Sequence, residues 1–162
     1  MSDPLRAVPQ GDTFGSATGA AGRRTSLAPV PDMPDSRAWQ PIAPAGDAPP
    51  PAGAYSPAIR AGDLIFVSGQ VPRDPRTGAM PDGITAQTRQ VLENLRAVLA
   101  SAGASLDDVV SITAYLGDIG DWEAFNATYR DVLRPPYPTR TTVGAQLHGF
   151  LVEISAIARV AP

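Results

Sequence analysis

Apolar residues recur with two different periods after residue 57, and this alternation constrains the fold more than any other feature of the chain. Residues 84–102 and 122–132 each carry an apolar stripe at helical spacing. Four other segments are β-branched runs or alternate in polarity, which predicts strands at residues 64–68, 110–116, 140–147 and 150–159. The predicted order is strand, helix, strand, helix, strand, strand.

Two helices cover only one face of such a sheet, yet neither face of the last strand is strongly polar. Leu151 and Ile157 lie on one side of it, and four apolar residues lie on the other side: Val152, Ile154, Ala156 and Ala158. A sheet with one helical layer and two partly apolar faces must bury the second face against something else. We therefore expect an α+β fold with two helices on one face, and an oligomer in which another copy covers the open face.

The chain before this pattern has a different composition. Residues 1–57 hold 11 of the 18 Pro and 6 of the 15 Gly and show no apolar period. This predicts a flexible Pro/Gly/Ala-rich extension over residues 1–52, followed by one folded domain over residues 53–162. The alternative is an arm that docks on a neighbouring subunit, with Trp39 as its anchor. Arg23-Arg24 precedes no apolar stretch, so we expect a cytoplasmic protein without an export signal.

Composition excludes several kinds of site. The 13 Arg are outnumbered by 16 Asp and Glu, giving a net charge of −3, which disfavours binding to nucleic acid. The chain has no Cys and one His, so thiol chemistry is excluded and we expect no metal and no cofactor. No apolar run approaches the roughly 20 residues of a membrane-spanning helix, so we expect no membrane partner.

Two charged residues near the C-terminus are the main candidates for chemistry. Glu153 lies in the apolar run LVEISAIA, where burial raises the pKa of a carboxyl group and suits it to acid–base work or to orienting water. Arg140 opens a strand after Pro138, and its planar guanidinium suits a carboxylate ligand. The alternatives are a structural ion pair or solvent-facing charge for Glu153, and a surface ion pair with an Asp for Arg140.

Local pairing predicts how these two residues are placed. A tight turn at His148-Gly149 makes the last two strands a hairpin that pairs Gly144 with Glu153. Arg140 then lies on the same face, roughly 13 Å from Glu153 at about 3.3 Å per residue, so that the two bracket a small ligand. His148 itself is expected to be a solvated turn residue.

Three weaker candidates have equally simple structural explanations. Tyr55, in GAYSPAI, stands at the entry to the folded part, where a tyrosine usually packs. Asn126 lies on the second helical stripe, where an asparagine is usually exposed. Gly69 ends a strand and lets a backbone approach a ligand closely, although a tight turn also explains it.

Six ordered blocks of the sequence resemble the RidA family, also called the YjgF or reactive-intermediate deaminase family. They are GAYSPAI, LIFVSGQVPRDPRTG, TRQVLENLRAVLASAGASLDDVV, DWEAFNATY, PTRTTV and LVEISAIA, and together they run from about residue 53 to residue 160. The resemblance implies a mixed sheet with two helices on one face, and a homotrimer around a central barrel with sites between subunits. It also implies hydrolysis of 2-iminopropanoate, 2-iminobutanoate and their enamine tautomers to 2-keto acids and ammonia, without a cofactor.

The resemblance also assigns roles to single residues. Arg140 falls on the arginine that binds the substrate carboxylate, and Glu153 on the glutamate that orients the attacking water. Four further positions fall on substrate-binding residues of the family: Tyr55, Gly69, Asn126 and Thr142.

The chain also departs from the family pattern. Arg140 and Glu153 are only 13 positions apart, two fewer than is typical, and Ser155 stands where a second Glu is usual. The alternative to a deaminase is therefore a non-catalytic or differently specific relative that binds a small carboxylate metabolite. The endoribonuclease label sometimes attached to the family fits poorly with an acidic chain.

Overall fold

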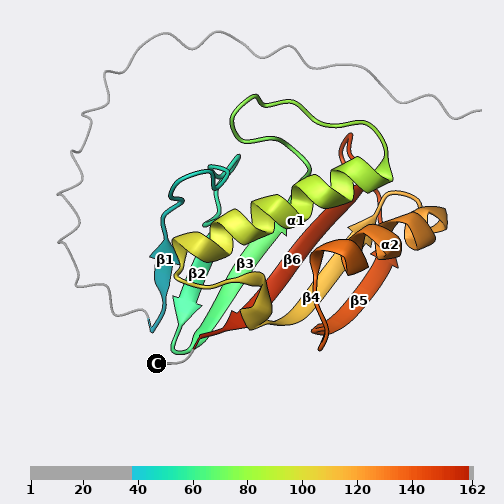
Figure 1. Ribbon diagram of the computed structural model, residues 1–162. Helices are drawn as coiled ribbons and strands as arrows, with labels where there is room; N and C mark the ends of the chain where they lie inside the picture. The colour runs from blue at the N-terminus through green and yellow to red at the C-terminus, as the bar shows by residue number, and fades with distance from the viewer. Residues whose placement is uncertain (1–37, 161–162) are drawn as a thin grey trace, which may run out of the picture. The chain divides into compact units, whose positions relative to one another are not determined.

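The computed structural model describes residues 38–160, in which one mixed sheet carries both α-helices on a single face (Figure 1). The strands are β1 (Gln40–Ile42), β2 (Ala58–Ala61), β3 (Leu64–Gln70), β4 (Val109–Leu116), β5 (Thr139–Gly144) and β6 (Val152–Arg159). The helices are α1 (Ile84–Ser101) and α2 (Trp122–Val132), and short 3₁₀ turns precede β4 and α2 at Leu106–Asp108 and Ile119–Asp121. The predicted α+β architecture is confirmed, together with its single helical layer.

The C-terminal strand β6 lies inside the sheet, whose order is β1-β2-β3-β6-β4-β5. It pairs antiparallel with β3 on one side and with β4 on the other, while β5 runs parallel to β4. Helix α2 makes the crossover that a parallel pair requires, from β4 to β5. The chain therefore closes its sheet by inserting the last strand between two earlier ones.

This topology shows that the predicted hairpin of the last two strands is wrong. Backbone hydrogen bonds hold the connection from β5 to β6 at the end of β4: Ala145 N–H donates to Leu116, and Gly117 N–H donates to Leu151. The backbone N–H of Leu151 also donates to Oε1 of the buried Gln87 on α1, over 2.7 Å. The connection thus carries the chain across β4 instead of folding it back on β5.

Helix α1 follows its predicted range closely. Its N-cap is Gly83, with φ of 78°. Gly103, with φ of 74°, follows the end of the helix, because a left-handed residue there lets Ala104 N–H donate to the carbonyl of Leu99. The buried stripe of α1 packs on β3 and β6.

The two faces of the sheet differ as the alternation in β6 predicts. Val152, Ile154, Ala156 and Ala158 are buried under the helices, whereas no element covers the opposite face of the described sheet. That open face presents Phe66 and Val143, 38% and 40% exposed. A partly apolar sheet face without a covering layer is therefore confirmed for the described chain.

Two details of the strands differ from the prediction. A register shift between Val109 and Ser111 buries Val109 and leaves Val110 exposed, although strict alternation with the buried Ile112 would bury Val110. Residues 40–42 form β1 and pair with β2, although the sequence prediction assigned them to the flexible extension. A three-residue edge strand that contains Pro41 has no period by which it could be recognised. Residues 1–37 of the predicted extension lie outside the described residues, and Trp39 just before β1 is half-buried.

Candidate active site

The side chain of Arg140 extends from β5 on the helix-covered side of the sheet and contacts α2. One guanidinium nitrogen donates a hydrogen bond to Oδ1 of Asn126 over 2.9 Å. The guanidinium carbon lies 4.5 Å from the ring centre of Tyr129 and 5.4 Å from that of Phe125. Phe125 and Tyr129 are one turn apart on α2, so both rings face β5 and offer the cation their negative faces. Three side chains of one helix therefore fix where this cation stands.

A cavity of about 280 Å³ lies beside the guanidinium of Arg140. It is lined by Asn126, Tyr129, Arg130, Tyr137, Pro138 and Arg140. No carboxylate pairs with Arg140 among the described residues, so the alternative of a surface ion pair with an Asp is wrong. Its remaining N–H donors are available to a planar anion such as a carboxylate.

Two hydroxyl groups near Arg140 have no hydrogen-bond partner within the described chain. Burial raises the pKa of Tyr129, against the opposing charge of Arg140, so this phenol stays protonated at neutral pH. The hydroxyl of Thr142 is buried as well, two positions along β5 from Arg140 and therefore on the same side of the sheet. Both groups can still donate or accept a hydrogen bond.

Glu153 lies on the other side of the sheet. Its neighbours in β6, Val152 and Ile154, are fully buried under the helices, so its side chain projects from the open face. A Cβ added to Gly69 of β3 would stand 2.8 Å from Cδ of Glu153, and closer still to its Oε1. Only glycine at position 69 therefore leaves room for this carboxylate.

The environment of Glu153 favours its uncharged form. Partial burial raises the pKa of Glu153, and no cation pairs with it among residues 38–160. No structural ion pair holds Glu153 within the described chain. A carboxyl group with a raised pKa and no ion-pair partner is suited to proton exchange with a bound ligand or water.

Tyr55 shares a cavity with Gly69, the residue that leaves room for Glu153. It lines a cavity of about 240 Å³ together with Gly69 and the proline run of residues 49–51. Its hydroxyl accepts a hydrogen bond from the N–H of Ala52 over 3.1 Å. The hydroxyl of Ser68 donates to the carbonyl of Ser56 over 2.7 Å, which ties this segment to the end of β3.

The predicted site residues thus form two groups in one chain. The arginine cluster comprises Arg140, Asn126 and Thr142, and the glutamate cluster comprises Glu153, Gly69 and Tyr55. Arg140 is level with Ile112 of β4, whereas Glu153 is level with Tyr115, three positions further along the same strand. An odd offset places two side chains on opposite faces, so the predicted same-face arrangement is wrong.

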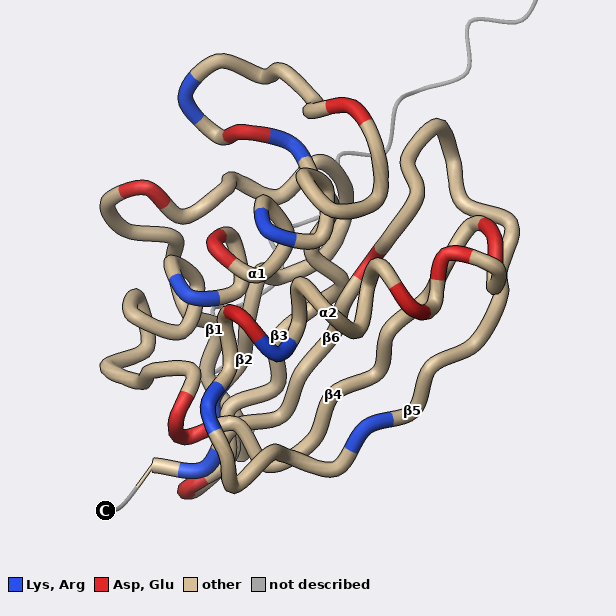
Figure 2. The backbone as a smooth tube through the Cα atoms, turned by 45° about the vertical axis from the view of Figure 1, so that its right-hand side comes forward, with Lys and Arg blue, Asp and Glu red and all other residues tan. Residues whose placement is uncertain are grey.

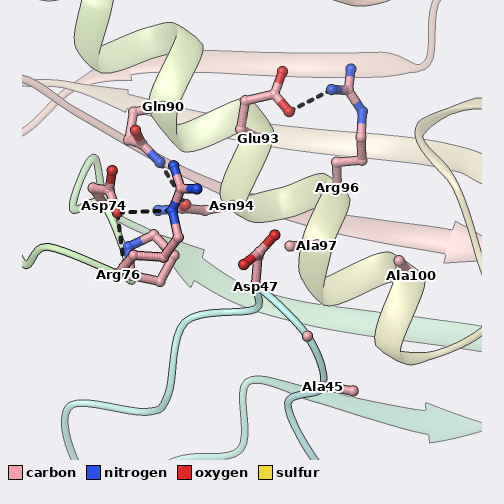
Figure 3. A pocket seen from close by; sticks show the side chains of 12 residues that line it. Ala45, Asp47, Asp74, Arg76, Gln90, Glu93, Asn94, Arg96, Ala97 and Ala100 are labelled. Atoms are coloured by element: carbon pink, nitrogen blue, oxygen red, sulfur yellow. Dashed lines mark hydrogen bonds and ion pairs between the residues drawn. The ribbon is translucent and has the colours of Figure 1, made fainter.

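A larger hollow of about 520 Å³ lies between α1, residues 45–47 and residues 74–76 (Figure 3). Glu93 pairs with Arg96 there, and Asp74 with Arg76, so much of its charge is already neutralised. It contains none of the predicted site residues. His148 is exposed, as predicted, and no group of three potential metal ligands is found in the part of the chain that the structure describes.

The fold and these residues can be compared with known proteins. The sequence matches the family described as endoribonuclease L-PSP over residues 45–160. The chain belongs to this family, the YjgF/RidA family. The resemblance predicted from the six sequence blocks is therefore confirmed.

Individual members of the family are similar over nearly their whole length. A RutC family protein of Pyrococcus horikoshii is 45% identical over 115 residues, which are 69% of this chain and 91% of that protein. A 2-iminobutanoate/2-iminopropanoate deaminase of Salmonella typhimurium is 37% identical over 117 residues, again 69% and 91% of the two chains. The crystal structure of RidA from a Psychrobacter species superimposes with a TM-score of 0.68 and 34% identity, covering 76% of this chain and 99% of that one.

Two further features of the described chain concern its charges and its helices. Acidic and basic segments are interspersed along the described chain, and β5 carries a single basic position, Arg140 (Figure 2). Neither described helix has the length and apolar character needed to cross a bilayer.

The sequence prediction missed the aromatic surroundings of Arg140. Phe125 and Tyr129 belong to the predicted apolar stripe of residues 122–132, and the prediction includes neither Tyr137 nor Arg130. The spacing did contain a signal, because Asn126 and Arg130 are one turn apart on α2. The sequence did not show that α2 lies over β5, because the strand that a helix covers follows from the topology of the sheet.

Proposed function

We propose that this protein hydrolyses small 2-imino acids, such as 2-iminopropanoate and 2-iminobutanoate, to 2-keto acids and ammonia. The observation that carries the proposal is the position of Arg140: a cation fixed by Asn126 and two aromatic rings, beside a cavity without a carboxylate. A cation held in this way suits the carboxylate of a 2-imino acid. The similarity to a relative named as a 2-iminobutanoate/2-iminopropanoate deaminase supports the same substrate class.

The proposed hydrolysis needs little more than a correctly positioned substrate and one base. A carboxylate conjugated to the C=N bond leaves the imine carbon electrophilic, and Arg140 holds it in place. Ionised Glu153 accepts a proton from water as the water oxygen bonds to that carbon. The proton then passes to nitrogen, which gives a carbinolamine. Its hydroxyl proton is transferred to nitrogen as the C–N bond breaks and the C=O bond forms, so that imine plus water gives the keto acid and ammonia. Proximity and charge placement supply the catalysis.

The two clusters lie on opposite faces of one sheet, so the proposed reaction requires more than one chain. We place each active site between two copies, with Arg140, Asn126 and Thr142 from one and the glutamate cluster from the next. The partly apolar open face around Phe66 gives a second copy a surface to cover, and a homotrimer closes this arrangement as a ring. Tyr55 and Gly69 then border the substrate from the Glu153 side.

Release of ammonia and keto acid tests the proposal directly. 2-Iminopropanoate and 2-iminobutanoate are generated in situ by an amino-acid oxidase, and product formation is measured with and without the protein. We expect turnover by the wild type and loss of about 100-fold or more of kcat/KM in Arg140→Ala, because a charge-assisted bidentate contact is lost.

Arg134→Ala is the matched control, since Arg134 is exposed and does not line the Arg140 cavity. Equal losses in the two variants would contradict the role of Arg140. Absence of turnover, with a small carboxylate still raising the melting temperature of the wild type, would favour the alternative of a non-catalytic binding protein.

A further inference from the structure

The cavity beside Arg140 contains a second guanidinium group. Arg130 lines it, one helical turn after Asn126, the residue that accepts the hydrogen bond of Arg140. Side chains four positions apart on a helix stand about 5–6 Å apart at Cβ. Arg130 is exposed, so its cation stands at the mouth of the cavity while Arg140 stands half-buried within it.

Neither guanidinium is neutralised in the described chain. The cavity lining contains two arginines and two tyrosines but no Asp or Glu. The acid next in sequence, Asp131, lies 3.8 Å from Arg89 of α1 and forms its ion pair there. Two like charges that share one small cavity repel each other, and a ligand with two negative groups removes this repulsion.

We propose that Arg130 binds a second carboxylate of the substrate, so that the protein prefers 2-imino dicarboxylates of four or five carbons over 2-imino monocarboxylates. This rests on the proposed function, because Arg140 must hold the carboxylate next to the imine. Arg130 stands one turn along α2 from Asn126, the residue that holds the guanidinium of Arg140, and both arginines line one cavity of about 280 Å³. A ligand small enough for this cavity would reach both cations with acidic groups separated by two or three carbon atoms. A guanidinium accepts a carboxylate through two parallel hydrogen bonds, which favours a second carboxylate over an uncharged end.

Arg130 acts on specificity and not on the reacting bond. Water still adds to the imine carbon, and ammonia still leaves it, at the end of the substrate held by Arg140. The contact with Arg130 is the same before and during the reaction, so its loss raises KM for the dicarboxylate and leaves kcat nearly unchanged.

The test compares 2-imino acids made in situ from aspartate and glutamate with those made from alanine and 2-aminobutyrate. We expect kcat/KM to be about tenfold or more higher for the dicarboxylates in the wild type, and Arg130→Gln to remove that preference through KM. Arg134→Gln, another exposed arginine near the end of α2 but outside this cavity, is the matched control and should keep the preference.

A binding measurement keeps the two proposals separable. Calorimetric titration with 2-oxoglutarate and 2-oxobutyrate needs no turnover, and we expect 2-oxoglutarate to bind about tenfold or more tightly, unless Arg130 is replaced by Gln. Turnover of monocarboxylates with no preference for either class overturns the role of Arg130 and leaves the proposed function standing. Selective binding of 2-oxoglutarate without turnover of any imino acid overturns the proposed function and supports the role of Arg130. An unchanged preference in Arg130→Gln overturns the inference.

Discussion

The arginine cluster and the glutamate cluster hold their charged groups in opposite ways. Arg140 is fixed by one hydrogen bond and two aromatic rings, all from α2. Glu153 has no ion-pair partner in the described chain, and the space for its carboxylate comes from the missing side chain of Gly69. A single chain therefore fixes the cation that would bind an anion, whereas it leaves the carboxyl group that would move a proton without a partner.

This difference also follows the chemistry expected of each group. A cation that binds a carboxylate performs best when its geometry is set before the ligand arrives, because ordering it later would cost affinity. A base performs best when its pKa lies near the working pH, and burial without a cation is what raises the pKa of Glu153. A salt bridge to Glu153 would have lowered that pKa again.

Among the variants considered, replacement of Glu153 should have the largest effect on catalysis. Glu153→Gln keeps the shape of the side chain but removes the base, so kcat should fall by about 10²–10⁴-fold while KM changes little. Steady-state kinetics on 2-iminobutanoate measure both. Glu123→Gln is the control, because Glu123 is exposed on α2 and lies outside both clusters. A rise in KM with unchanged kcat would instead place Glu153 among the binding residues.

Mixing two inactive variants tests whether the clusters meet across copies. Arg140→Ala and Glu153→Gln chains, unfolded and refolded together in equal amounts, should regain about one quarter of the wild-type activity, since random assembly joins intact clusters in about one quarter of the sites. Each variant refolded alone is the control and should stay inactive. Continued inactivity of the mixture, with mixed assembly verified by native mass spectrometry, would place both clusters of a site in one chain.

The aromatic rings around Arg140 allow a finer test of the arginine cluster. Tyr129→Leu removes the ring 4.5 Å from the guanidinium carbon, so KM should rise by about 5–30-fold, the equivalent of a desolvated cation–π contact. Tyr129→Phe keeps the ring and removes only the hydroxyl, so it should stay close to the wild type. An equal rise in KM in both variants would assign the effect to the hydroxyl instead.

The sequence predicted local structure better than long-range pairing. The stripe of α1 and the alternation of β6 depend on neighbouring residues, so the range of α1 and the buried side of β6 could be predicted. The pairing of β5 with β4 depends on where the connection of residues 145–151 is tied, through Gln87 and the end of β4. No local pattern encodes that choice, and a hairpin was the simplest local alternative.

The same limit explains what was missed in the candidate site. Glu153 could be found because a charged residue in an apolar strand is rare. Arg140 could be found because it opens a strand after Pro138 and its guanidinium suits a carboxylate. Their placement on opposite faces follows from the register of β4 with both of its neighbours, which a single strand does not reveal. Phe125 and Tyr129 look like ordinary core residues in the sequence, and only the crossover of α2 over β5 brings them to Arg140.

The smallest effect we expect concerns the pH dependence of stability, where the two clusters should again differ. Burial raises the pKa of Glu153 above its ordinary value, so the folded chain binds this proton more tightly than the unfolded chain. The resulting stabilisation is complete below the ordinary pKa of a glutamate, about 4.3, and is lost as the pH rises through the raised pKa. Catalysis by ionised Glu153 should increase over the same range in which stability decreases.

Glu153→Gln isolates this contribution, because it removes the titrating group and leaves the other carboxyl groups in place. Thermal melts from pH 4 to pH 8 should therefore show a smaller loss of stability at high pH in the variant. We expect a difference below the roughly 2–4 °C that corresponds to about 1 kcal/mol in a protein of this size, because the carboxylate is partly hydrated. Asp63 and Asp74 act with the opposite sign and at lower pH, since the hydrogen bonds they accept from Arg159 and from the N–H groups of Arg76 and Thr77 lower their pKa values. Identical pH profiles in the two proteins would mean that the Glu153 carboxylate is as well solvated in the folded chain as in the unfolded one, and the contrast between the clusters would then rest on geometry alone.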